Sequence, residues 1–75
     1  MQKSVELTAM IEREGDGFVA VCPELDIASQ GETIEEARAN LVEALEGFFL
    51  TASAAELDAS LPKELYVTRV QIPVA

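Results

Sequence analysis

Residues 17–49 read GFVAVCPELDIASQGETIEEARANLVEALEGFF, and this stretch predicts the fold of the chain. It opens with residues 18–22, which are apolar on both faces of an extended strand, so we expect that strand to be central or covered on both sides. Pro23 has no N–H to continue a central ladder and ends the strand. A loop over 24–26 and a short third strand over 27–30 follow.

The second half of the stretch predicts a long amphipathic helix that begins after Gly31. Thr33 and Glu36 have the spacing of a capping box, in which each side chain satisfies the free N–H of the other residue. Apolar residues then recur every three or four positions, which places them on one stripe that can cover a sheet. The stripe consists of Ile34, Ala37, Leu41, Ala44, Leu45, Phe48 and Ala52.

The flanking segments predict further strands. Apolar and polar residues alternate over 5–11, which indicates a strand with one buried face, and the glycines of the turn at 15–17 join it to the second strand as a hairpin. Downstream, a second capping-box spacing at 53–56 predicts a short helix that Pro62 ends. A last strand is predicted over 65–74, with one face formed by Tyr66, Thr68, Val70, Ile72 and Val74.

These elements predict an α+β fold of order β-β-β-α-β. We expect an antiparallel sheet of three to four strands with one long helix packed on one face. At 75 residues the chain is one domain, spanning 1–75, with no repeat or linker.

The charge of the chain bears on its partners. Fourteen acidic residues stand against five basic ones, with no histidine, for a formal net charge of −9. Direct nucleic-acid binding is not expected, because phosphate contacts need clustered Lys and Arg. A basic protein partner is favoured by long-range attraction. The alternative is that the charge only keeps the chain in solution.

The residue types exclude most catalytic sites. Without histidine there is no base for a nucleophile, and Cys22, the single cysteine, excludes a disulfide framework and a cysteine-based zinc site. We therefore expect no enzyme activity, cofactor or metal. An anion site at the helix start is disfavoured by Glu32, Glu35 and Glu36. A Mg²⁺-dependent nuclease site is the weakest alternative; its candidate ligands are Glu6, Glu12, Glu24 and Asp26.

The sequence also predicts an oligomer. A hydrophobic content of 49% is high for so small a domain, which suggests that some apolar surface meets another subunit. Val42 and Phe49 share one flank of the helix, and Leu50 falls on its polar face. These three residues are the predicted interface of a homodimer or homotetramer. The alternative for the flank is a core wide enough to cover it within one chain.

No signal peptide or membrane-spanning run is visible, so we expect a cytoplasmic protein without membrane contact.

The ordered residues of the central stretch resemble the HicB-like antitoxin family. The resemblance rests on Gly17, Phe18, Ala20, Pro23, Glu24, Leu25, Ser29, Gln30, Gly31, Thr33, Glu35, Glu36, Ala37 and Asn40. The chain departs from the family at 26–28, where it reads Asp-Ile-Ala instead of Pro-Gly-Cys. The resemblance implies a partial ribonuclease-H-like fold without nuclease activity.

The resemblance further implies a partner. Members of this family bind a small basic toxin of the HicA type, which cleaves mRNA, and mask it. We expect contacts from the loop formed by Pro23, Glu24, Leu25 and Asp26. Many relatives carry a C-terminal DNA-binding domain that this sequence does not contain, so direct DNA binding is not expected. The alternative function is a stand-alone oligomeric binding or structural protein that keeps the fold without a toxin.

Overall fold

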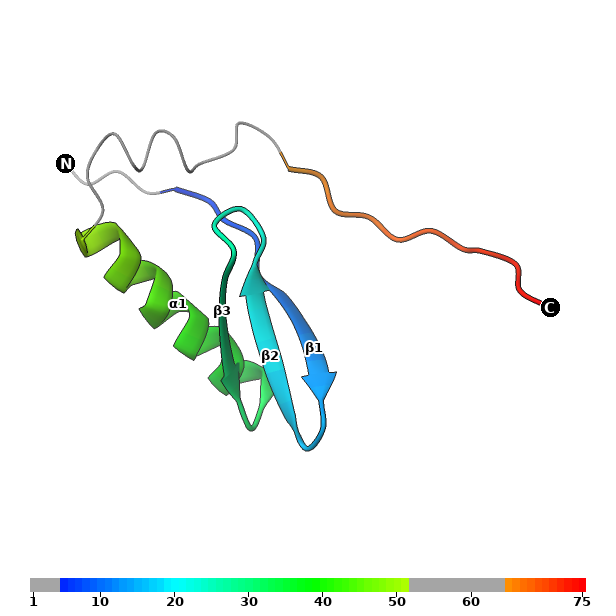
Figure 1. The fold of residues 1–75 in the computed structure, drawn as a ribbon, viewed down its shortest axis with the longest axis horizontal. Coiled ribbons are helices and arrows are strands. Elements are labelled where there is room, and N and C mark those ends of the chain that lie inside the picture. The colour runs from blue at the N-terminus through cyan, green and yellow to red at the C-terminus, as the bar shows by residue number, and fades with distance from the viewer. Residues whose placement is uncertain (1–4, 52–64) are drawn as a thin grey trace.

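The computed structural model describes residues 5–51 and 65–75 of the chain, which forms an α+β fold (Figure 1). Three antiparallel strands in the order β1-β2-β3 are followed by one long helix. The elements are β1 (Met10–Glu14), β2 (Gly17–Cys22), β3 (Ile27–Gly31) and α1 (Ile34–Thr51). The predicted sheet of three strands with a helix after it is therefore confirmed.

A tight hairpin sets the register of β1 and β2. The strands pair from Glu14 opposite Gly17 to Met10 opposite Val21, which leaves only two residues in the turn. Gly15 has a positive φ of 60°, the conformation that a two-residue hairpin turn requires at its first position. Gly17 belongs to the strand itself, where a Cβ would lie 2.8 Å from the carbonyl oxygen of Gly31.

The second connection brings β3 alongside β2, which becomes the central strand. These strands pair from Phe18 opposite Gly31 to Cys22 opposite Ile27. The strand β2 ends one residue before Pro23, as the missing N–H predicts. Asp26 has a positive φ of 55° and completes the loop into β3.

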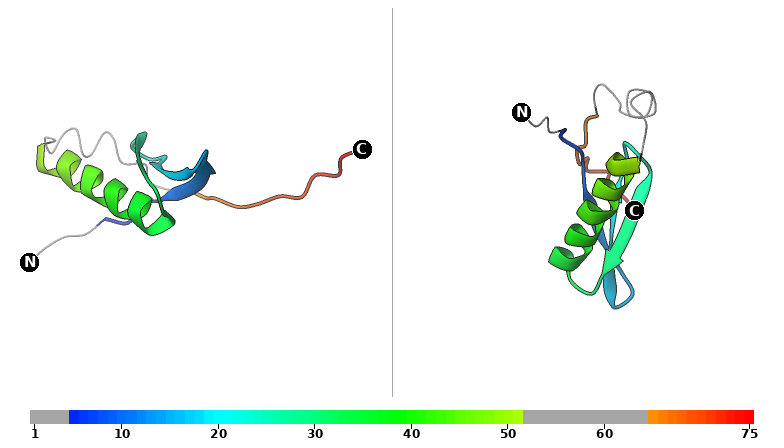
Figure 2. Two further views of the ribbon diagram at one scale, coloured as in Figure 1. Left: turned by 90° about the horizontal axis from the view of Figure 1, so that it is seen from below. Right: turned by 90° about the vertical axis from the view of Figure 1, so that its left-hand side faces the viewer.

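The core lies between one face of the sheet and the helix (Figure 2). Ala20 and Cys22 of β2 are fully buried against Ala37 and Leu41 of α1. Their partly buried neighbours are Leu7, Ile11, Phe18, Leu25, Ile27 and Leu45. The prediction that this strand is central or covered on both sides is confirmed by its central position in the sheet. Of its two faces, one packs against α1, the only helix among the described residues.

The buried stripe of the helix is narrower than predicted. Ile34 is 48% exposed and Ala44 is also exposed, although both fall on the predicted stripe. The sheet that the described residues form has three strands and is narrow, so the two margins of the helix lie beyond it and stay exposed.

The first strand begins later than predicted. Residues 5–9 do not belong to β1, which starts at Met10. The reason is the length of the partner, because β2 ends at Cys22 and Met10 is already opposite Val21. The backbone N–H of Thr8 donates instead to the carboxylate of Glu24.

The strand predicted over 65–74 is not part of the sheet. Residues 65–75 are all exposed, lie in no strand or helix, and extend away from the other described elements (orange to red in Figure 1). The Cα radius of gyration is accordingly 14.7 Å, against about 11 Å for a compact chain of this length. An alternating pattern makes a strand only where a neighbour pairs with its backbone groups. Among the residues that the structure describes, β1, β2 and β3 pair only with one another.

Two further sequence predictions concern other parts of the chain. The short helix expected after residue 52 lies outside the described residues, as does Ala52 itself. Within the described part, no helix is long and apolar enough to cross a membrane.

Candidate functional site

The loop predicted to bind a partner is held in place by an internal hydrogen-bond cluster. Glu24 accepts hydrogen bonds from the Thr8 backbone N–H, at 3.0 and 3.2 Å to its two oxygens, and from the Thr8 hydroxyl at 2.8 Å. A carboxylate that accepts three hydrogen bonds from the two donors of one residue ties the loop to the segment before β1. Glu24 therefore has a structural task in the loop.

Cys22 lies beside this carboxylate. Its thiol donates to the Glu24 Oε1 atom at 3.5 Å. Burial raises the pKa of Cys22 above 9.0, and the neighbouring carboxylate raises it further. Desolvation also acts to raise the pKa of Glu24, but the hydrogen bonds from Thr8 outweigh it and hold that pKa below 4.5. At neutral pH the pair is a thiol and a carboxylate, and a buried thiol of this kind is a poor nucleophile.

The other residues of the loop differ in accessibility. Leu25 packs against the core cluster, and Pro23 is half-buried. Asp26 is exposed at the tip, where its positive φ turns the chain toward β3. The structure thus places the four predicted residues in one loop, with Asp26 the most accessible of them.

The residues predicted to form an oligomer interface lie along α1. Val42 is 41% exposed and Leu50 is 86% exposed. Phe49 is half-buried and stacks edge-to-face on Phe48, with ring centroids 5.4 Å apart. Val42 and Leu50 are therefore accessible apolar side chains, whereas Phe49 is partly covered by contact with Phe48 of the same helix.

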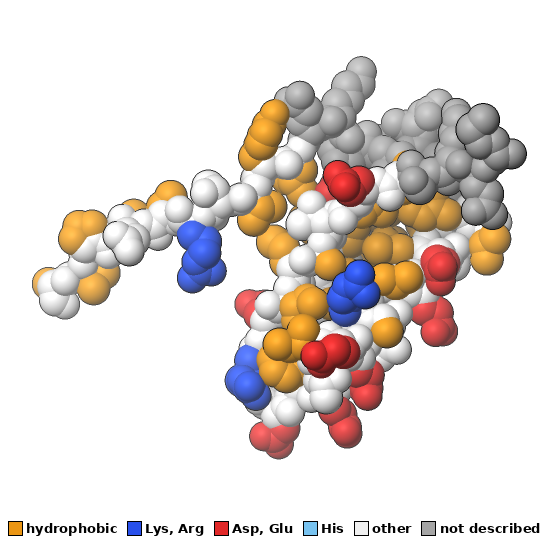
Figure 3. Space-filling model, turned by 180° about the vertical axis from the view of Figure 1, so that it is seen from behind, with side chains coloured by type: hydrophobic (Ala, Val, Ile, Leu, Met, Phe, Trp, Pro, Cys, Tyr) orange, Lys and Arg blue, Asp and Glu red, His pale blue; other side chains and the backbone are white. Residues whose placement is uncertain are grey.

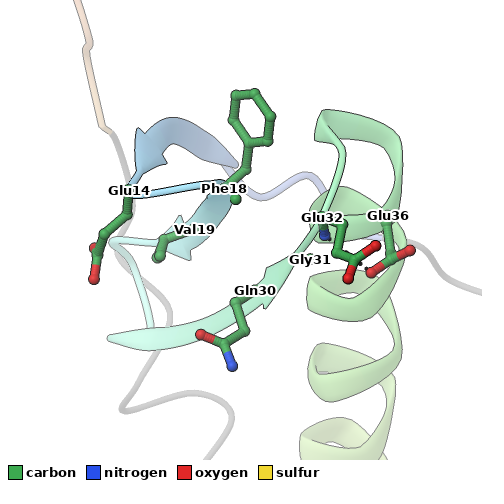
Figure 4. Close-up of a pocket in the computed structure, with 8 residues that line it drawn as sticks. Glu14, Phe18, Val19, Gln30, Gly31, Glu32 and Glu36 are labelled. Carbon is green, nitrogen blue, oxygen red and sulfur yellow. Dashed lines mark hydrogen bonds between the residues drawn. The ribbon is translucent and has the colours of Figure 1, made fainter.

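A shallow hollow lies where the hairpin meets the start of α1 (Figure 4). It is lined by Glu14, Gly17, Phe18, Val19, Gln30, Gly31, Glu32 and Glu36. Its three carboxylates disfavour an anion, in line with the expectation from the sequence. The sequence did not indicate the hollow itself, because its walls come from segments that only the sheet register brings together.

The helix start uses one of these carboxylates for capping. The Thr33 hydroxyl accepts from the Glu36 N–H at 3.0 Å, as the capping box predicts. The Glu36 carboxylate accepts from the N–H of Glu32, also at 3.0 Å, whereas the motif predicted the N–H of Thr33. Glu36 is therefore part of the fold, and no described group of three or more Asp, Glu or Cys side chains could hold a metal ion.

The exposed charge of the described body is mainly negative. Acidic side chains surround a central region of hydrophobic ones in Figure 3. On α1 the exposed acidic residues are Glu35, Glu36, Glu43 and Glu46, and on β1 they are Glu12 and Glu14. Arg13 lies over the ring of Phe18, with its guanidinium carbon 4.6 Å from the ring centroid. The surface therefore suits a positively charged partner.

Comparison of the sequence with known proteins finds a relative that aligns over most of the chain. The chain is 39% identical over 70 residues to the UPF0150 protein ssl0738 of Synechocystis sp., a match that covers 91% of this chain and 96% of the relative. The protein belongs to the UPF0150 family, which is the HicB-like family. No model of a known protein family matches the chain. No solved structure matches it either.

Proposed function

We propose that this chain is an antitoxin-type protein, which neutralises a small basic mRNA-cleaving toxin of the HicA type by binding it. The observation that carries the proposal is membership of the HicB-like family, through a relative that aligns over nearly the whole chain. The chain acts by binding and not by catalysis, and it contacts the toxin and not DNA.

The charge of the surface supports this proposal. A toxin that cleaves mRNA needs a positive surface to hold phosphates. The chain has a formal net charge of −9, and the acidic residues of β1 and of the outer face of α1 are exposed. Attraction between the negative surface of this chain and a positive surface of the toxin would speed their association, and the same negative surface would repel acidic proteins.

We place the contact at the loop of Pro23, Glu24, Leu25 and Asp26. Asp26 would meet the toxin directly, since it is the exposed residue of the four. Glu24 would act through the loop, because its carboxylate accepts three hydrogen bonds from Thr8. A rigid loop loses little conformational entropy when it binds.

Co-expression tests the proposal. A small basic protein encoded beside this gene should co-purify with the chain, and its ribonuclease activity should disappear in the complex. Asp26→Asn should weaken the complex, whereas Asp16→Asn, which removes the same charge from the exposed hairpin turn, should not. Failure of the two proteins to co-purify at low salt would contradict the proposal.

A second candidate is a stand-alone oligomeric protein with this fold and no toxin partner. The exposed apolar side chains of Val42 and Leu50 on α1 favour it. Two observations together distinguish the candidates: the oligomeric state measured by light scattering, and the identity of the protein encoded beside this gene. A stable homo-oligomer with no toxin-like neighbour would favour the second candidate, and capture of a toxin would favour the first.

A further inference from the structure

The segment over residues 65–75 has the pattern of a strand but is not paired in the sheet. All eleven of its residues are exposed. Its hydrophobic side chains are open to water: Leu65 43%, Tyr66 83%, Val67 59%, Val70 75%, Ile72 70% and Val74 87%. Folded domains rarely leave so many apolar side chains of one segment uncovered unless another surface meets them.

Of the two edge strands of the described sheet, β1 is the one that lies away from α1 and can receive such a segment. The helix flanks the β3 side, where the Asn40 amide donates to the Gln30 carbonyl at 2.8 Å. On the other side, no described strand pairs with the outer edge of β1. Alternate backbone N–H and C=O groups of β1 point to that side, and an added strand would satisfy them.

We propose that residues 66–72 of a second copy of this chain add as a strand along the outer edge of β1, and that the exchange is reciprocal. Two copies then form a closed dimer with two-fold symmetry, in which each completes the sheet of the other. This inference does not depend on a toxin partner.

The two faces of the segment match the two faces of the sheet at β1. Ile11 lies opposite buried Ala20 and faces the helix, and Glu12 lies opposite Val19 on the other face. The face of the segment that carries Val70 and Ile72 would extend the core beyond half-buried Ile11. The alternate face carries Arg69, which would then lie on the same side as Glu12 and Glu14.

Charge complementarity favours residues 65–75 beside the acidic edge strand of a copy of this chain, and because the segment extends away from its own sheet, that edge belongs to a second copy (Figure 1). Residues 65–75 contain Arg69 and no acidic residue, for a formal charge of +1. Since the whole chain has −9, residues 1–64 have a formal charge of −10. Pro73 fits the same arrangement, because the added strand becomes the new edge of the sheet, where a proline near the end of a strand is tolerated.

Sedimentation and light scattering test the proposal. The wild-type chain should have twice the 8.1 kDa mass of one copy. Val70→Ser with Ile72→Ser should shift the mass to that of one copy, whereas Gln71→Ser, on the opposite face of the segment, should leave the dimer intact. Circular dichroism should show the same helix content in all three proteins, because α1 has no part in the exchange.

Isotope-filtered NMR of a dimer that contains one labelled and one unlabelled copy tests which strands meet. Nuclear Overhauser effects should connect residues 10–14 of one copy with residues 66–72 of the other. A monomeric wild-type chain would overturn the proposal, and so would effects confined to a single copy. The proposal would also be overturned if Leu50→Ser lost the dimer while the variant with Val70→Ser and Ile72→Ser kept it. That result would assign the interface to α1.

Discussion

Two glycines show how local space decides the effect of one methyl group. At Gly31 a Cβ would lie 2.5 Å from the backbone nitrogen of Ala37, because the start of α1 passes directly over the end of β3. At Gly47 a Cβ would meet no heavy atom within 4 Å outside its own helix. Substitution of glycine by alanine should therefore lower the stability of the protein at position 31 and raise it at position 47.

Gly31→Ala should lower the free energy of unfolding by about 1–3 kcal/mol, the usual cost of inserting a group into a packed site. Gly47→Ala should raise it by roughly 0.5–1 kcal/mol, since alanine is the better helix former in an open position. Urea denaturation of the two variants measures both. Equal shifts of the same sign would contradict the packing that the structure shows at β3 and α1.

The Glu24 carboxylate gives a prediction about acid stability. Desolvation acts to raise the pKa of this carboxyl, but the hydrogen bonds from Thr8 stabilise its charged form more strongly. The pKa in the folded chain is therefore lower than the ordinary value. The contribution of this carboxylate to stability is therefore fully present well above the pKa of the unfolded chain, and it is lost as the pH falls through the lower pKa of the folded chain. Glu24→Gln should be less stable than the wild type at neutral pH, and the difference should shrink in acid.

Thermal denaturation across this pH range measures that difference. Glu6→Gln is the matched control, because Glu6 is exposed and its carboxylate accepts none of the hydrogen bonds of the loop. Its stability should follow that of the wild type at every pH. If the stability difference between the wild type and Glu24→Gln does not change as the pH is lowered, the charge of the Glu24 carboxylate is not the cause of that difference.

At the scale of elements, α1 depends on the cap at its start. Thr33→Ala removes the hydroxyl that accepts from the Glu36 N–H and should cost about 1 kcal/mol. Thr51→Ala, at the other end of the same helix, removes only hydroxyl bonds to carbonyls of the preceding turn. That control should change stability by less, because Thr51 is exposed and those carbonyls keep access to water. Chemical denaturation compares the two.

At the scale of the whole molecule, the charge of −9 predicts a response to salt. Like charges on a compact chain repel one another, and dissolved ions screen this repulsion. The Tm should rise as NaCl is added. Glu43→Gln with Glu46→Gln removes two exposed charges from α1 and should reduce that rise. A Tm independent of salt in both proteins would show that self-repulsion does not limit stability.

Much of the fold could be predicted because its signals are local. Pro23 ends a central strand because it has no N–H for the ladder, and Thr33 with Glu36 caps a helix through residues only three positions apart. The candidate site was less predictable. The four loop residues were named from a resemblance, but only the structure separates exposed Asp26 from Glu24, which is bonded to Thr8 sixteen residues away.

The sequence by itself determined the order of strands and helix, the turn at Gly15, the stop at Pro23 and the acidic character of the surface. Tertiary structure alone decided where β1 begins, which margin of α1 stays exposed, and that residues 65–75 lie outside the sheet of their own chain. The physical reason is that alternation records a preference for an extended conformation with one covered face. Whether a strand forms depends on a neighbour that can pair with its backbone, and that neighbour is set by the whole fold or by a second chain.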